Sequence, residues 1–392
     1  MLIAKMINYG NHFVDKEDLK KITKPLSEKY LTSGKYLNLF ENKIKNYFKC
    51  KYVIACSSGT SAIFLAMKSL NLKKNDIIIM PIINFVASAN IANLLGCKIY
   101  FADVHEKTGQ MTPETLKNCI KDNKLKKISV VLTMYMAGHP YNISEFYKLK
   151  NKYKFTLIED ACHAFGSQYK INSLHKIGSC KHSDIATFSF HPLKTITTGE
   201  GGCLTTNNYK IFQMAKNLRN HGFDSNYKKA HWQYDLIKSS LNFRLSELNC
   251  ALGVSQIKKV NFFLKKRSDL ANNYFKLFRK IKLKKYIELP QFDKLKIKSS
   301  WHLFLINIDF TKFNTKKELL MNHLFKKGLK VQYHYTPINQ FRIFKVPNTV
   351  FRGAKNYKRS TISIPIFVAL NKSNQIKVVK LINNFLKKKL IK

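Results

Sequence analysis

Acidic residues are scarce in this chain. Its 392 residues include 23 aspartate and glutamate residues against 69 lysine and arginine residues, which gives a formal net charge of +46. A field of that size attracts nucleic acid or an anionic membrane surface. The lysines are dispersed along the chain, however, mostly at helix positions expected to face solvent, and no nucleic-acid-recognition motif accompanies them. We therefore interpret the charge as compositional drift rather than a functional basic face, and we expect no specific nucleic-acid partner.

Two further absences restrict the function. The eight cysteines form no Cys-x-x-Cys pair and have no histidine at metal-ligand spacing, which argues against a disulfide framework and predicts reduced thiols and no bound metal. The most apolar region, residues 77–95, is interrupted by Pro81 and by asparagines, so it fits strand, loop and helix better than a membrane span. Residues 1–5 lack a signal-peptide pattern. We expect a cytoplasmic protein without a membrane span.

Strand and helix patterns alternate from about residue 52 to residue 220. Such alternation predicts an α/β fold with a mainly parallel sheet covered by helices. Further expected elements are a long helical stretch from Arg244 to about Phe278, strands at residues 301–306 and 363–366, and a helix at residues 316–327. With this length and 45% hydrophobic content, we predict a large α/β domain over residues 1–255 and a smaller C-terminal α+β domain over residues 256–392.

Asp160 and Lys194 are the pair that points most directly to a chemistry. Asp160 ends the apolar stretch 155–160, a strand whose carboxyl end lies where open α/β sheets place their ligands. Lys194 follows thirty-four positions later, on a turn rich in threonine and glycine between two expected strands. Pyridoxal 5′-phosphate requires a lysine for its aldehyde and a carboxylate that keeps its ring nitrogen protonated. Taken singly, Lys194 also fits a solvated charge and Asp160 a helix cap.

Other positions fit the same cofactor. Residues 57–62 form a small polar turn that opens an apolar-periodic helix. Free N–H groups and the positive dipole end at such a turn suit a phosphate, with Thr60 and Ser61 as its ligands, although ordinary helix capping explains the same residues. Phe85 follows the next strand and is placed either to stack on a planar ring or to join the core. His163 lies close enough to Asp160 to bond the ring's phenolic oxygen, or it is structural.

In this order the motifs resemble the aspartate-aminotransferase-like fold, fold type I, of pyridoxal phosphate enzymes. Within that fold the chain is similar to the sugar-nucleotide aminotransferases of the DegT/DnrJ/EryC/StrS family. The resemblance covers nearly the whole chain, and its most specific segments are residues 31–35, 58–62, 159–166, 188–202, 242–247 and 331–337. It implies an enzyme with a large domain around a mainly parallel sheet and a smaller C-terminal domain.

The resemblance also assigns roles to single residues. It implies that Lys194 binds the cofactor covalently and acts as the general base, and that Asp160 is the partner of the pyridine nitrogen. The other implied contacts are Thr60, Ser61 and Ser189 with the phosphate, Phe85 and His163 with the ring, and His334 and Tyr335 with the substrate. Asn242 resembles the asparagine that reaches the cofactor phosphate of a neighbouring subunit, which implies a homodimer with shared active sites. Dehydrating relatives have histidine in place of Lys194, so this lysine favours amino transfer.

Residues 31–41, 242–259 and 333–338 are most similar to family members that act on UDP-linked 4-keto-6-deoxy-N-acetylhexosamines in the pseudaminic acid pathway. This implies L-glutamate as the amino donor and a 4-amino sugar nucleotide as the product. Neighbouring subfamilies share most of these motifs, so a GDP- or dTDP-linked 4-keto sugar stays an alternative substrate. Two alternatives are not enzymes. A nucleic-acid-binding protein is favoured by the charge alone and leaves Asp160 and Lys194 unexplained. A cofactor-binding regulator on this fold is harder to exclude, although such regulators usually carry an appended DNA-binding domain.

Overall fold

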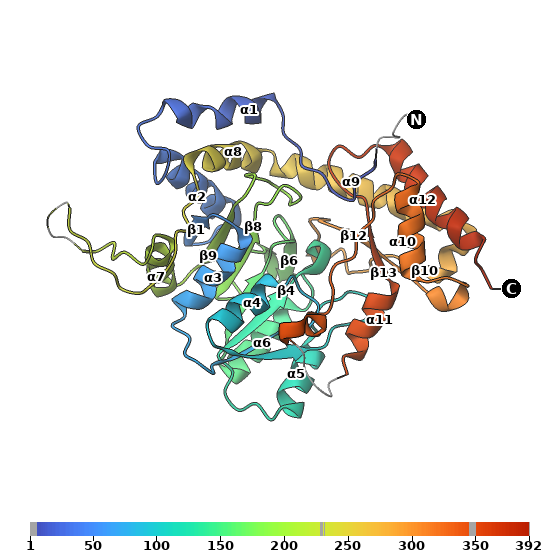
Figure 1. Ribbon diagram of the computed structural model, residues 1–392, viewed down its shortest axis with the longest axis horizontal. Helices are drawn as coiled ribbons and strands as arrows, with labels where there is room; N and C mark the ends of the chain where they lie inside the picture. Colours follow the sequence, from blue (N-terminus) through green and yellow to red (C-terminus); the bar gives the residue numbers. More distant parts are fainter. Residues whose placement is uncertain (1–5, 228–229, 231, 345–349, 392) are drawn as a thin grey trace.

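A computed structural model describes residues 6–227, 230, 232–344 and 350–391. Its centre is a seven-stranded sheet with the order β1-β9-β8-β5-β4-β2-β3 (Figure 1). These strands are β1 (Tyr52–Cys56), β2 (Ile77–Pro81), β3 (Lys98–Ala102), β4 (Val130–Met134), β5 (Thr156–Asp160), β8 (Ile185–Ser189) and β9 (Gly202–Thr206). Only β9 runs antiparallel to its neighbours in this sheet. The predicted mainly parallel sheet is therefore confirmed.

Helices cover both faces of this sheet, because successive strand residues point to opposite sides. In β1, Ile54 and Cys56 pack into one core, whereas Val53 and Ala55 pack into another on the opposite face. The first face is covered by α3 (Gly59–Ser69), α4 (Ala87–Leu94) and α7 (Tyr209–Arg219). The second is covered by α2 (Lys35–Phe48), α5 (Pro113–Asp122), α6 (Ile143–Tyr153) and α8 (Glu247–Lys258). Burial of both faces explains why the strands read as continuous apolar runs.

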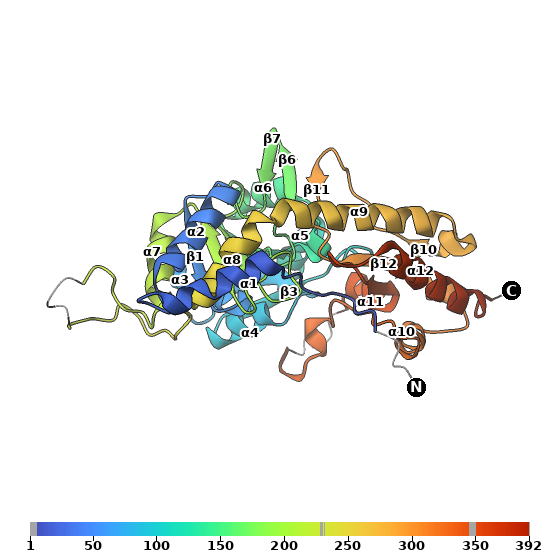
Figure 2. The ribbon, with the colours of Figure 1, turned by 90° about the horizontal axis from the view of Figure 1, so that it is seen from above.

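A second sheet, β10-β12-β13, organises the C-terminal part of the chain. Its strands are β10 (Ile287–Glu288), β12 (Phe304–Ile308) and β13 (Thr361–Ile364), with helices α9 (Val260–Arg279), α10 (Lys317–Lys326), α11 (Arg352–Ser360) and α12 (Lys372–Lys387). Residues of α9, α10 and α12 share one apolar core with these strands. In Figure 2, α9 runs from the end of α8 along the whole C-terminal part.

A third, smaller sheet connects the two parts of the molecule. Its strands are β6 (Gln168–Ile171), β7 (Ser173–Lys176) and β11 (Ile297–Lys298), and β11 pairs with β6 across the boundary between the two parts. The remaining helical elements are α1 (Lys16–Ile22) and the 3-10 turns η1 (Lys24–Ser27), η2 (Met136–Gly138), η3 (Lys282–Tyr286), η4 (Phe310–Lys312), η5 (Ile338–Gln340) and η6 (Arg342–Phe344). We propose the predicted division at residues 255 and 256 as the domain boundary, since the separate C-terminal core supports it.

Three predicted elements differ from the structure. The strand expected at residues 363–366 is β13, which ends at Ile364, because Pro365 has no N–H with which to continue the pairing. The expected helix from Arg244 to Phe278 is two helices, α8 and α9, that meet at Lys259. There the backbone leaves helical geometry, and the Lys259 ammonium is held 2.7 Å from Asp15 and 2.6 Å from Asp18. The strand expected at residues 301–306 begins only at Phe304, because Trp301 has a positive φ of 51° and cannot continue a strand.

Candidate active site

A cavity of about 630 Å³ lies at the carboxyl ends of β5 and β8, between the central sheet and the segment 332–336. Open α/β sheets place their ligands at this edge. Eight of the ten predicted site residues line the cavity: Thr60, Phe85, Asp160, His163, Ser189, Lys194, His334 and Tyr335. Ser61 and Asn242 do not. Side chains that are far apart in the sequence therefore converge on one space.

Lys194 lies in the turn between β8 and β9. Its backbone N–H donates to the carbonyl of His191 at 2.9 Å, and the Thr197 hydroxyl donates to the carbonyl of Phe190 at 3.0 Å, which fixes the shape of the turn. The lysine side chain is partly buried, and burial lowers the pKa of its ammonium, against the opposing influence of Cys162 and Asp160. A lysine with a lowered pKa spends more time neutral, as a nucleophile or general base must.

Asp160 is the last residue of β5 and is only 3% exposed. Its Oδ1 accepts the backbone N–H of Cys162 at 3.2 Å. Burial raises the pKa of this carboxyl, while Cys162, the Lys194 ammonium and a hydrogen bond from Asn84 act in the opposite direction. A carboxylate held by neighbouring donors and facing the same cavity as a lysine is suited to bind a protonated ring nitrogen.

The N-terminus of α3 forms another wall of the cavity. Ser58 caps this helix by accepting the N–H of Ser61 at 3.0 Å. A Cβ on Gly59 would lie 2.7 Å from the Cβ of Ser189, so only glycine lets the helix start approach the end of β8 this closely. The start of α3, with its positive dipole end, thus lies beside the Ser189 side chain, an arrangement that suits a phosphate.

Ser61 and Asn242 have other surroundings. Ser61 is 6% exposed, and its hydroxyl lies 2.9 Å from the hydroxyls of both Ser57 and Ser58 behind the cavity wall. Asn242 is exposed on the segment before α8, where its Oδ1 accepts the backbone N–H of Arg244 at 3.1 Å. Within one chain, therefore, neither side chain faces the cavity.

Three histidines and a tyrosine form the side of the cavity next to Lys194. The His163 and His302 rings lie 4.2 Å apart, and the Tyr335 hydroxyl is 2.9 Å from Nε2 of His163. Burial, together with the nearby Lys194 and His334, keeps the pKa of His163 well below its usual range, and burial lowers the pKa of His334 to about 3. Burial likewise holds the pKa of His302 well below its usual range. All three rings are therefore neutral at pH 7.

Phe85 stands at the open side of the cavity, 54% exposed, with its ring centroid 5.8 Å from that of Tyr335. An exposed aromatic beside a cavity presents a face on which a planar ring can stack. The sequence did not indicate three other lining residues, Tyr9, Asn84 and His302. Asn84 directly precedes Phe85 and could have been inferred from that position. Tyr9 and His302 reach the cavity only through the packing of distant segments, so their local sequence contains no signal.

These residues fit pyridoxal 5′-phosphate. Lys194 would bind its aldehyde, Asp160 its ring nitrogen, Phe85 one ring face, and Thr60, Ser189 and the start of α3 its phosphate. Within the described residues, Nδ1 of the buried His163 has no hydrogen-bond partner, so a polar atom of a bound ring would satisfy it. The described residues contain no cluster of His, Cys, Asp or Glu suited to a metal ion. In the same ranges, every helix is too short or too polar to cross a membrane.

Comparison with known proteins gives the family. A model of the DegT/DnrJ/EryC1/StrS aminotransferase family matches residues 13–383. A UDP-4-amino-4,6-dideoxy-N-acetyl-beta-L-altrosamine transaminase of Campylobacter jejuni is 34% identical over 373 residues, which cover 93% of this chain and 94% of that protein. A transaminase of the same name from Helicobacter pylori is 32% identical over 372 residues, covering 94% of each chain.

A solved structure gives the same result. PseC of Helicobacter pylori, an aminotransferase involved in the biosynthesis of pseudoaminic acid, superposes with a TM-score of 0.87 at 30% sequence identity. The match covers 98% of this chain and 100% of that chain. The predicted family and fold are thereby confirmed. This chain belongs to the DegT/DnrJ/EryC1/StrS aminotransferase family.

Proposed function

We propose that this protein transfers an amino group from L-glutamate to the 4-keto carbon of a UDP-linked 4-keto-6-deoxy-N-acetylhexosamine, with pyridoxal 5′-phosphate as cofactor. The product would be a 4-amino sugar nucleotide of the pathway to pseudaminic acid. The names of the two relatives that are 34% and 32% identical support this substrate. The observation that carries the reaction type is the convergence of Lys194 and Asp160 on one cavity beside the N-terminus of α3.

The chemistry assigned to the chain is proton transfer and positioning. When bound, pyridoxal phosphate supplies a ring that accepts the negative charge developing on a substrate carbon. Asp160 holds the proton on the ring nitrogen, which keeps the ring able to accept that charge. Nζ of Lys194, whose pKa burial lowers, takes the proton from the Cα of L-glutamate. In the second half of the reaction the same nitrogen delivers a proton to C4 of the sugar.

The segment 332–336 is the proposed contact region for the sugar. His334 and Tyr335 both line the cavity, and Tyr335 faces Phe85 across its open side. Nδ1 of His334 is paired with the Ser363 hydroxyl at 2.7 Å, which orients the ring. A neutral His334 and the Tyr335 hydroxyl would offer hydrogen bonds to sugar hydroxyls without adding charge. Because these two residues belong to the C-terminal part and Lys194 to the central sheet, the substrate would lie between them.

We further propose a homodimer in which Asn242 completes the partner's site. Asn242 is exposed and lies outside the cavity of its own chain, which supports a role toward a second copy. The described residues of the segment between α7 and α8 extend away from the body of the molecule in both views (Figures 1 and 2). They expose large apolar side chains, among them Tyr234, Leu236 and Leu241. Exposed apolar side chains gathered on an extended segment are typical of a protein contact.

A reducing compartment suits this chain. All eight cysteines are free, and seven of them are buried. Free buried thiols are usual in cytoplasmic proteins. We therefore keep the cytoplasm as the proposed location.

The first test is spectroscopic. Purified protein supplied with pyridoxal phosphate is scanned in the visible range, then mixed with L-glutamate, and 2-oxoglutarate is measured in the solution. We expect the band of the lysine-bound cofactor to disappear on addition of glutamate as stoichiometric 2-oxoglutarate forms. UDP-, GDP- and dTDP-linked 4-keto sugars are then added separately. If only a GDP- or dTDP-linked sugar restores the band, that sugar replaces the UDP-linked sugar as the proposed substrate. A protein that binds no cofactor would refute the proposed activity.

Mixing two variants, each of which lacks one residue of the proposed site, tests whether the site is shared. Lys194→Ala lacks the base but keeps Asn242, whereas Asn242→Ala keeps the base but lacks the asparagine. A mixed dimer contains one complete site if Asn242 acts across the interface, so partial activity should return after subunit exchange. Two affinity tags on the variants allow the mixed dimer to be isolated. An inactive mixed dimer would show that the sites are not shared in this way.

A further inference from the structure

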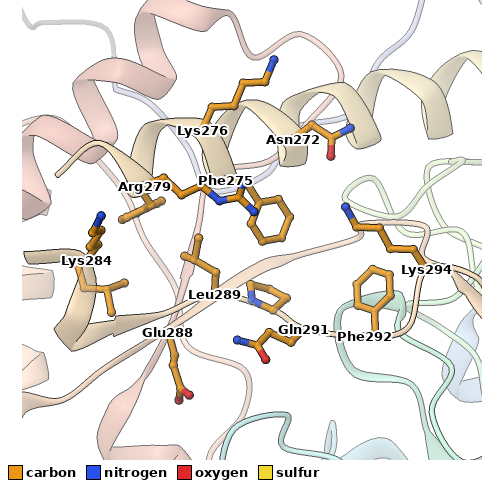
Figure 3. A pocket seen from close by; sticks show the side chains of 13 residues that line it. Asn272, Phe275, Lys276, Arg279, Lys284, Glu288, Leu289, Gln291, Phe292 and Lys294 are labelled. Atoms are coloured by element: carbon orange, nitrogen blue, oxygen red, sulfur yellow. The ribbon is translucent and has the colours of Figure 1, made fainter.

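A second cavity, of about 820 Å³, lies in the C-terminal part and is separate from the candidate active site. It is open to solvent and is lined by the last turns of α9, by β10, and by the segment that follows β10 (Figure 3). Its residues differ completely from those that line the active-site cavity. The volume falls within the range of about 300–1,000 Å³ that small-molecule sites occupy.

One side of this cavity is aromatic and apolar. Phe275 and Phe292 line it, together with Leu289 and Pro290. Both phenylalanine rings rest on Trp301, with centroid distances of 5.8 Å for Phe275 and 5.5 Å for Phe292. The tryptophan is itself 6% exposed, so it holds the two rings against the core while they remain accessible from the cavity. Such rings offer flat surfaces to a planar group.

Four basic side chains also line the cavity. They are Lys276, Arg279, Lys284 and Lys294, and none of them forms an ion pair with the described residues. The Lys294 ammonium lies 5.9 Å from the centroid of the Phe275 ring, so positive charge and aromatic surface meet directly. The one acidic lining residue, Glu288, is paired with Lys107 at 2.6 Å. Figure 3 shows Arg279 and Lys294 extending toward Phe275 from opposite sides. The cavity therefore joins unpaired positive charge to aromatic surface.

From this combination we infer that the second cavity binds a nucleoside diphosphate. A base would lie against Phe275 and Phe292, and the side-chain amides of Asn272 and Gln291 would be available to its polar edge. The diphosphate would meet Arg279 and the lysines, of which the arginine can form paired hydrogen bonds to phosphate oxygens. A purely apolar ligand would leave four cations unpaired, and a simple anion would leave the aromatic wall exposed.

Trp301 gives this cavity a contact with the active site. It directly precedes His302, whose ring lies 4.2 Å from that of His163. The carbonyls of Trp301 and His302 both accept hydrogen bonds from the buried Arg267, at 3.1 Å and 3.3 Å. The chain has two tryptophans. Replacing the other with phenylalanine, Trp232→Phe, leaves Trp301 as the only tryptophan, so tryptophan emission reports on this cavity.

Calorimetry with UDP tests the inference. Arg279 and Lys294 are replaced together by alanine (R279A/K294A), and the matched control is K266A/K280A, which removes the same charge from α9 and the residue after it without touching the cavity. We expect R279A/K294A to lose one class of UDP sites or to weaken it about tenfold or more, since charge-assisted bonds are lost. The control should bind as the wild type does. Wild-type stoichiometry and affinity in R279A/K294A would overturn the inference, as would the absence of UDP binding by the wild type up to about 1 mM.

Fluorescence provides the second measurement, in the Trp232→Phe background with cofactor bound. UDP should change the emission of Trp301, and adding R279A/K294A to this background should abolish that change while leaving the visible band of the cofactor intact. An unaltered response in the combined variant contradicts the inference. The inference does not rest on the proposed activity. If no keto sugar is converted, UDP binding that depends on Arg279 still supports a nucleotide site in the second cavity. If UDP does not bind in the second cavity, the proposed amino transfer is unaffected.

Discussion

Glu159, the residue before Asp160, should make the stability of the protein depend on pH. Its side chain is 2% exposed, and Oε1 accepts the Tyr135 hydroxyl at 2.7 Å. Burial raises the pKa of this carboxyl from 4.5 to about 7. The unfolded chain therefore loses the proton at a lower pH than the folded protein does. The contribution of the protonated Glu159 carboxyl to the free energy of unfolding is therefore complete below pH 4.5, and it is lost as the pH rises through about 7.

The size of the effect follows from that shift. At about 1.4 kcal/mol per pH unit, ionisation of Glu159 costs the folded state about 3 kcal/mol. Glu159→Gln removes the titration but keeps an oxygen to accept the Tyr135 hydroxyl. With an unfolding entropy of about 2.1 cal/mol/K per residue, about 3 kcal/mol corresponds to about 4 °C in the melting temperature of a chain of this length.

Thermal unfolding of the cofactor-loaded protein measures this directly. The melting temperature of Glu159→Gln minus that of the wild type should rise by about 3 °C between pH 5 and pH 8. The rise is smaller than the full 4 °C because pH 5 already lies about half a unit above the pKa of the unfolded chain, so part of the cost of ionisation is present there. Glu114→Gln, at an exposed glutamate of α5, is the control and should show less than about 1 °C. A difference for Glu159→Gln that stays constant with pH would refute the argument that this carboxyl is buried and protonated.

Three further predictions concern the site. After borohydride treatment, the wild type should retain the cofactor mass in a peptide containing Lys194, and Lys194→Ala should not; covalent label at another lysine would contradict this assignment. Tyr335→Phe removes the hydrogen bond to Nε2 of His163, worth about 1 kcal/mol, which orients the ring that we assign to the cofactor. The dissociation constant of the cofactor should therefore rise about fivefold in an absorption titration. Unchanged affinity would separate Tyr335 from cofactor binding. Glu247 accepts three backbone N–H groups at the start of α2, and Glu247→Gln should destabilise the protein by about 2 kcal/mol, measured as a melting temperature lower by about 2–3 °C; an equal temperature would argue against these bonds.

The local pattern of the sequence determined the elements of the central sheet and the residues at their ends. Alternating apolar strands and helices form a mainly parallel sheet with helices on both faces. In such a sheet β5 and β8 could be expected to bring Asp160 and the turn with Lys194 to the same edge. The glycine and small residues before α3 similarly indicated a helix start open to a ligand. These features depend on neighbours in the sequence, and periodicity reports on such neighbours.

Only the tertiary structure decided which distant side chains complete the cavity. Tyr9 comes from the N-terminal segment and His302 from the approach to β12, and both reach the cavity through packing between separate parts of the chain. The break between α8 and α9 has the same origin, since Lys259 is held by Asp15 and Asp18, more than two hundred residues away. The second cavity forms because Trp301 supports Phe275 and Phe292 from behind. Contacts between remote segments leave no local period in the sequence, so packing alone determines them.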